Sequence, residues 1–159
     1  MLIPVEVSSF AVEPQKSVPL IILKETGGAR SVAIPLDPVE ACAIAMHSLK
    51  VPSDKPFTID LVKIAIEQLG GELYRSVISD VEDSAFTSYI VIKAAASLKV
   101  VNCRPCDAVA LAMRCGAQMF VKETVFCKLS SDRGLSEEEE LRAQIRAVDA
   151  VEFGKMVLE

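Results

Sequence analysis

Two similar segments, each preceded by a hairpin pattern, constrain the fold of this chain more than any other feature. Residues 38–46 read Pro-Val-Glu-Ala-Cys-Ala-Ile-Ala-Met, and residues 105–113 read Pro-Cys-Asp-Ala-Val-Ala-Leu-Ala-Met, with five of the nine positions identical. The hairpin patterns occupy residues 20–36 and 89–103. Alanine-rich helices resemble one another by chance, but here the proline, the acid and the hairpin keep the same order. We therefore predict two copies of a hairpin-plus-helix unit.

The second copy carries the more suggestive junction, because a strand is predicted to end and a helix to begin near residue 104. Pro105 suits the first turn of a helix, and Asp107 can accept hydrogen bonds from the free N–H groups there. Arg104 adds a fixed positive charge, where the first copy has Asp37. This combination is suited to anion binding or catalysis. The alternative is an ordinary capped helix, with Asp107 paired to Arg104 or Arg114.

The remaining segments complete an α+β pattern. In the first 16 residues we expect a short strand followed by a turn. Further strands are predicted at 19–24, 31–36, 72–80, 85–93, 98–102 and 117–127, the last one broken at Lys122-Glu123, and helices at 39–49, 58–69 and 106–115.

After a polar loop at 128–135, Ser136 and Glu139 have the spacing of a capping box. They open a C-terminal helix whose apolar side is Leu141, Ile145 and Val148. We expect a mixed or antiparallel sheet in a domain of residues 1–130, followed by a helical tail of residues 131–159.

The amino-acid composition limits the classes of protein to which this chain can belong. The 159 residues are 51% hydrophobic, which suits one globular domain, and the net charge of −5 argues against a broad basic surface for nucleic acid. No apolar run approaches the length of about 20 residues that spans a bilayer. The N-terminus lacks a signal-peptide pattern, and five cysteines fit reduced thiols. We expect a cytoplasmic protein that does not contact membranes.

The cysteines and the single histidine are weaker candidates for catalysis or metal binding. Cys103 and Cys106 form a C-x-x-C pattern like that of thiol–disulfide enzymes, but it stands late in the chain and no aromatic residue precedes it. A zinc site from Cys103, Cys106, Cys115 and Cys127 lacks a second closely spaced pair. His47 is most simply placed at a helix end. No phosphate-binding glycine loop or nucleophile elbow is present.

Carboxylates near the ends of predicted elements remain as the main candidates. They are Asp37, Glu40, Asp60, Asp80, Glu82, Asp83 and Asp107. If the two copies pack by pseudo-symmetry, Glu40 and Asp107 face a common cleft. Such oxygens can hold Mg²⁺ or Mn²⁺, which activates water and offsets phosphate charge. We therefore expect Asp107 and Glu40 as metal ligands, Arg104 as a bidentate phosphate clamp and Asp60 as a third carboxylate.

Three blocks of the sequence resemble the bifunctional nuclease domain family over roughly residues 15–127. They are Glu40-Ala41-x-Ala43-Ile44-Ala45, Lys55-Pro56-x-Thr58-x-Asp60-Leu61 and Arg104-Pro105-x-Asp107-Ala108-x-Ala110-Leu111-Ala112. The resemblance implies a compact α+β domain that self-associates. It also implies a nuclease that hydrolyses phosphodiester bonds in RNA and DNA. We expect this activity to be metal-assisted and the protein to be a homo-oligomer.

The chain departs from the family pattern at four positions. Ile59 stands where the family usually has histidine, and Asn102 stands where it usually has aspartate. Cys106 replaces a usual serine, and Lys55 a usual arginine. If the histidine or the aspartate takes part in catalysis, activity here is reduced or lost. The alternative function is that of a non-enzymatic oligomeric binding or regulatory protein.

Overall fold

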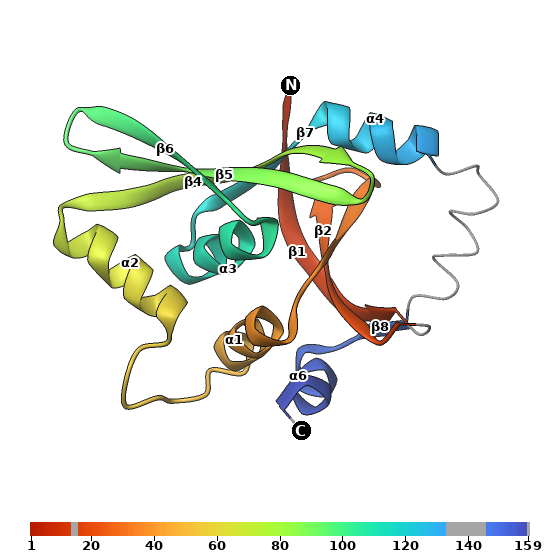
Figure 1. Cartoon of the computed structure of the whole chain (residues 1–159), viewed down its shortest axis with the longest axis horizontal. Helices are drawn as coiled ribbons and strands as arrows, with labels where there is room; N and C mark the ends of the chain where they lie inside the picture. The colour runs from red at the N-terminus through yellow and green to blue at the C-terminus, as the bar shows by residue number, and fades with distance from the viewer. Residues whose placement is uncertain (14–15, 133–145, 159) are drawn as a thin grey trace.

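A computed structural model describes residues 1–13, 16–132 and 146–158, and these residues build one curved sheet with helices packed on it (Figure 1). The strands are β1 (Leu2–Glu13), β2 (Val18–Glu25), β3 (Ser31–Pro35), β4 (Gly71–Glu82), β5 (Ala85–Ala94), β6 (Ser97–Cys103), β7 (Gln118–Lys122) and β8 (Arg146–Val148). The helices are α1 (Pro38–Ser48), α2 (Thr58–Gln68), α3 (Pro105–Cys115), α4 (Glu123–Asp132) and α6 (Ala150–Leu158).

The sheet is mixed, which confirms the predicted α+β class. Its strand order is β3-β2-β1-β7-β4-β5-β6, and β8 pairs with β1 outside this path. β4 and β7 are parallel, whereas the other neighbours are antiparallel. β7 therefore joins two antiparallel groups, β1–β3 and β4–β6, into one sheet.

Each group ends in a hairpin that leads directly into a helix. The β2–β3 hairpin precedes α1, and the β5–β6 hairpin precedes α3. α3 ends at Gly116, whose φ of 63° is the left-handed conformation that glycine adopts without a Cβ clash. The predicted strands and helices of both segments are thus present, with boundaries shifted by a residue or two.

The main core cluster lies between the sheet and the helices α1, α3 and α6 (Figure 1), and it also includes Val125 and Phe126 of α4. Small side chains line the helices where they pack. Ala41 and Ala45 of α1 and Ala110 of α3 are buried in one cluster, while Ala108 and Ala112 of α3 belong to a second cluster with Leu73 and Ile90. Short side chains let these helices approach the sheet closely.

The prediction for residues 117–127 was partly wrong. β7 ends at Lys122, and Glu123 begins α4, which extends through most of the residues expected to form a loop. Val125, Phe126 and Leu129 recur at helical spacing, and the first two are buried. Burial of this helical face against the core outweighs the strand propensity of the short apolar run.

The C-terminal residues differ from the predicted helical tail. Val148, expected on a helix, lies in β8 and pairs with Phe10 of β1. The following helix α6 buries Phe153, whose ring stacks on Phe10 with centroids 4.6 Å apart. The expected helix start at Ser136 lies outside the described residues, and the domain boundary at residue 130 stays a prediction.

No helix in the described part of the chain has the length and apolar character needed to cross a membrane.

Candidate functional site

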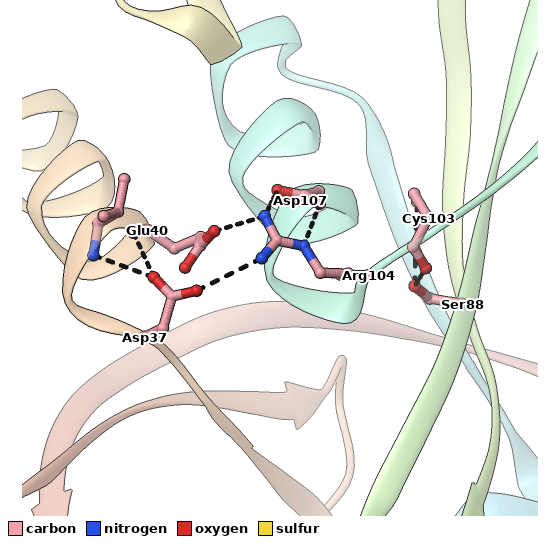
Figure 2. A network of polar contacts seen from close by, with 7 residues as sticks. Asp37, Glu40, Ser88, Cys103, Arg104 and Asp107 are labelled. Carbon is pink, nitrogen blue, oxygen red and sulfur yellow. Dashed lines mark hydrogen bonds and ion pairs between the residues drawn. The ribbon is translucent and has the colours of Figure 1, made fainter.

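The N-termini of α1 and α3 meet at a cluster of four charged side chains, shown in Figure 2. Asp37 is the N-cap of α1, where its Oδ1 accepts hydrogen bonds from the N–H groups of Val39 and Glu40. Arg104 holds the corresponding N-cap position of α3. Glu40 and Asp107 lie three residues after these caps, one in each first turn. We call these four residues the Arg104 cluster.

The guanidinium of Arg104 contacts all three carboxylates. Its Nε lies 2.9 Å from Oδ2 of Asp107 and its Nη2 lies 3.1 Å from Oδ1, which is a bidentate pair. Nη2 also donates to Oε1 of Glu40 at 2.5 Å, and Nη1 donates to Oδ2 of Asp37 at 3.4 Å. Its hydrogen bond to Asp107 raises the pKa of Arg104 above the ordinary value. Arg104 thus links the first turns of two helices that are distant in sequence.

The exposure of the cluster is uneven. The Arg104 side chain is 60% exposed, and Asp37 and Asp107 are part-exposed, whereas Glu40 is only 9% exposed. The second oxygen of Glu40, Oε2, is buried without a hydrogen-bond partner. A buried, unpartnered carboxylate oxygen is costly, and such an oxygen is suited to binding a cation.

The charge of the cluster also favours a cation. Three carboxylates and one guanidinium give −3 + 1 = −2. The two helix N-termini offset only part of this, since each contributes about half a positive charge. A phosphate would be repelled by the remaining negative charge. A divalent cation among the carboxylates would cancel it.

Cys106 adds a second type of potential ligand, a thiol, to the carboxylates of the cluster. Ligand atoms of Glu40, Cys106 and Asp107 lie within 4.8 Å of one another, and over the described residues this is the one such group of histidine, cysteine and acidic side chains. The donor set therefore fits a metal ion. Cys103, Cys115 and Cys127 lie outside the group, so the four-cysteine zinc site gains no support.

The thiol–disulfide hypothesis also lacks support. Burial raises the pKa of the Cys103 thiol and of the Cys106 thiol. Thiol–disulfide catalysts depend on the opposite shift, because the thiolate is the reactive form.

Asp60 lies apart from the Arg104 cluster. Its Oδ1 accepts from Nε of Arg114, in the last turn of α3, and its Oδ2 accepts from the N–H of Phe57 at the start of α2. Arg104 and Arg114 are ten residues apart on this helix, which corresponds to about 15 Å of helix rise. Of the four predicted catalytic residues, the structure brings together Arg104, Glu40 and Asp107.

A separate hollow of about 470 Å³ lies beside Asp60. It is lined by residues near the end of α1 and the start of α2, including His47, Lys55 and Phe57, together with Arg114. Loss of hydration there, followed by the nearby charge of Arg114, lowers the pKa of His47. This hollow combines Asp60 with basic side chains and a histidine, whereas the Arg104 cluster has three carboxylates around one arginine.

With this geometry established, comparison with known proteins assigns the chain to a family. The family model for the bifunctional nuclease domain matches residues 21–133, which include the whole Arg104 cluster and Asp60. The chain belongs to the bifunctional nuclease domain family. This confirms the resemblance seen in the sequence.

Two relatives of this bifunctional nuclease domain come from Mycobacterium tuberculosis. They are the uncharacterized protein MT1877 of strain CDC 1551 / Oshkosh and the uncharacterized protein Rv1829 of strain H37Rv. Each is 30% identical over 149 residues, which cover 94% of this chain and 89% of the relative.

Two members of the site in this bifunctional nuclease domain were missed from the sequence. Asp37 was noted as the counterpart of Arg104 but not as its partner. Cys106 was considered as a redox thiol or as one of four cysteines at a zinc site, but not together with Glu40 and Asp107, although its place beside Asp107 in the first turn of α3 could have indicated this.

Proposed function

We propose that this bifunctional nuclease domain hydrolyses phosphodiester bonds in RNA and DNA at the Arg104 cluster, with the help of a divalent cation. The observation that carries the proposal is the convergence of Glu40, Arg104 and Asp107, with one buried oxygen of Glu40 left without a partner. Membership of the family supports the same activity.

Arg104 is the residue best suited to bind the substrate. Its guanidinium presents paired donors in one plane, which match two oxygens of a phosphate. In the present arrangement these donors are occupied by carboxylates. Because the side chain is largely exposed, it can exchange a carboxylate for a phosphate without disturbing the core.

Glu40 and Asp107 are the residues best suited to hold the cation. Their oxygens face one another across the two helix N-termini, and both contact Arg104 now. When bound, a divalent cation such as Mg²⁺ or Mn²⁺ supplies a more acidic water and offsets the charge of the phosphate. Because the Glu40 side chain is buried, its carboxylate has a fixed position and sets the geometry of the Glu40–Asp107 pair.

Asp60 has a different part in this proposal from the one expected. Its ion pair with Arg114 and its hydrogen bond at the start of α2 support a positioning role. Ile59, the neighbour that replaces the family's usual histidine, packs against both core clusters. We therefore expect a slower nuclease than family members that carry the histidine.

A cleavage assay tests the proposal. Purified protein is incubated with end-labelled single-stranded RNA and DNA, with Mg²⁺ or Mn²⁺ and with excess chelator. We expect cleavage that requires the cation and is abolished in Asp107→Ala. The matched control is Glu6→Ala, which removes an exposed carboxylate from β1. Equal cleavage by wild type and Asp107→Ala would identify a contaminant and end the assignment.

A second candidate is a non-enzymatic binding or regulatory protein. One observation favours it: the guanidinium of Arg104 is held by three carboxylates, as in a purely structural junction. This candidate predicts that Asp107→Ala changes stability without any cleavage to lose.

Three further proposals accompany the function. Exposed apolar side chains on β6, namely Leu98, Val100 and Val101, support self-association, which light scattering tests.

Five free cysteines support a reducing, cytoplasmic location. The equivalent N-cap and third positions of α1 and α3 support an internal duplication, and so do the two preceding hairpins.

A further inference from the structure

Three potential ligand atoms of two chemical types converge at the start of α3. Glu40 and Asp107 offer carboxylate oxygens, and Cys106 offers a sulfur, all within 4.8 Å of one another. Two of these side chains are buried, since Cys106 is 7% exposed and Glu40 is 9% exposed. The unpartnered Oε2 of Glu40 is an independent sign that the group lacks a ligand. A solvated acidic surface would not leave such an oxygen buried.

The sulfur distinguishes this group from a magnesium site. Mg²⁺ prefers six oxygen ligands and keeps several waters, whereas a thiolate selects softer ions such as Zn²⁺. Three protein ligands and one open position are the usual arrangement of a catalytic zinc site. We propose that Glu40, Cys106 and Asp107 bind Zn²⁺ and that Arg104 occupies this site as a built-in competing cation when zinc is absent. The inference deepens the proposed function, because it names the cation that the nuclease would use.

Arg104 has the geometry of a displaceable counterion. Its guanidinium pairs with both carboxylates of the ligand group, at 2.5 Å from Glu40 and 2.9 Å from Asp107. The side chain is 60% exposed, and its guanidinium is held by the carboxylates of Asp37, Glu40 and Asp107. Zinc would neutralise these carboxylates and weaken their hold on Arg104. The guanidinium would then be free to bind phosphate beside the metal site.

The binding step conserves charge and atoms. The S–H bond of Cys106 breaks, its proton passes to the solvent, and the thiolate takes up Zn²⁺ together with one oxygen from each carboxylate. No oxidant or reductant takes part.

Cobalt spectroscopy tests the inference directly. Protein freed of metal with chelator is titrated with Co²⁺, a zinc substitute that absorbs in the near ultraviolet when a thiolate binds it. We expect this sulfur-to-cobalt band to saturate at one equivalent and to disappear when Zn²⁺ is added. Cys106→Ser should lose the band and weaken Zn²⁺ binding by about 100-fold or more, which exceeds the loss typical when a residue that only hydrogen-bonds to a metal ligand is replaced.

Three further variants make the test specific. Cys103→Ser, three residues away on β6, should keep the band, because that thiol lies outside the ligand group. Arg104→Ala should tighten Zn²⁺ binding several-fold, since it removes the competing cation. Far-ultraviolet circular dichroism checks that each variant is folded, and Asp107→Asn provides a second ligand variant that should also weaken binding.

The outcomes separate this inference from the proposed function. A cobalt band that depends on Cys106, without any cleavage of RNA or DNA, would support the zinc site and count against the nuclease. Cleavage that depends on Mg²⁺, with no cobalt band, would support the nuclease and overturn the zinc site. A band that survives Cys106→Ser, or weaker zinc binding in Arg104→Ala, would also overturn it.

Discussion

Arg104 and Glu40, which are 64 residues apart in sequence, join the first turns of α3 and α1 through a direct ion pair. The pair has one exposed partner and one buried partner. It therefore couples an exposed side chain to a carboxylate that the core holds in place. Substitutions in this arrangement should separate the contacts that support stability from those that support function.

Asp107→Asn should reduce activity far more than stability. The Arg104–Asp107 pair is part-exposed, and exposed ion pairs contribute only about 0.2–1 kcal/mol. If Asp107 stabilises the transition state of the reaction, the cleavage rate should fall by about 100-fold or more. Urea unfolding and the cleavage rate are measured on the same sample. A large loss of stability with no change in cleavage would assign Asp107 to the structure alone.

Glu40→Gln should leave the free energy of unfolding unchanged or raise it. The substitution removes a buried carboxylate with one unpartnered oxygen, and we expect a change within about 1 kcal/mol because the lost pairing is offset by the lower desolvation cost. Urea unfolding measures it, with Glu6→Gln as the exposed control. A loss above about 2 kcal/mol would mean that the pair with Arg104 holds the helices together.

Arg114→Lys should destabilise the protein, although it preserves the charge. The Arg114 side chain is buried, and its guanidinium donates to Asp60 and to the carbonyl oxygens of Ala43 and Ala110. A lysine cannot reproduce this set of donors, so we expect a loss of about 2–3 kcal/mol. Thermal and urea unfolding measure it.

The control for Arg114→Lys is Arg104→Lys on the same helix. Because Arg104 is exposed, its replacement should cost no more than about 1 kcal/mol. Equal losses in the two variants would contradict the structural role assigned to Arg114.

Phe153→Ala should destabilise the protein, because Phe153 packs α6 into the core. The Phe153 side chain is fully buried and stacks on Phe10, so its removal should cost about 3–5 kcal/mol. Met156→Ala, at an exposed position of α6, should stay within about 0.5 kcal/mol of wild type. If both variants unfolded like wild type, α6 would contribute nothing to the stability of the domain.

His47 should make stability fall as the pH decreases. Its pKa in the folded protein is lowered, so the unfolded chain takes up a proton at a higher pH than the folded protein does. The contribution is complete above the ordinary pKa of 6.5 and is lost as the pH falls toward the folded value. His47→Gln should flatten the dependence between about pH 8 and pH 5.

Proton NMR gives an independent check of His47. The chain has one histidine, so the imidazole signals need no assignment. A titration midpoint at or above the ordinary value would contradict the lowered pKa.

The sequence by itself determined the local features of this protein. Pro38 and Pro105 mark the helix starts, and Arg104 and Asp107 pair because they are three residues apart at one helix terminus. The order of strands and helices from residue 18 to residue 115 follows from turn residues and side-chain periodicity. These features depend on interactions between neighbours in the chain, which a sequence displays directly.

Tertiary structure decided everything that depends on distant partners. It placed Glu40 against Arg104, brought Cys106 close to Glu40 and Asp107, and paired Asp60 with Arg114 instead. It also turned residues 123–132 into a helix and added residues 146–148 to the sheet as β8. In each case burial against segments distant in sequence outweighs local preference, and the identity of those segments is fixed only when the chain has folded.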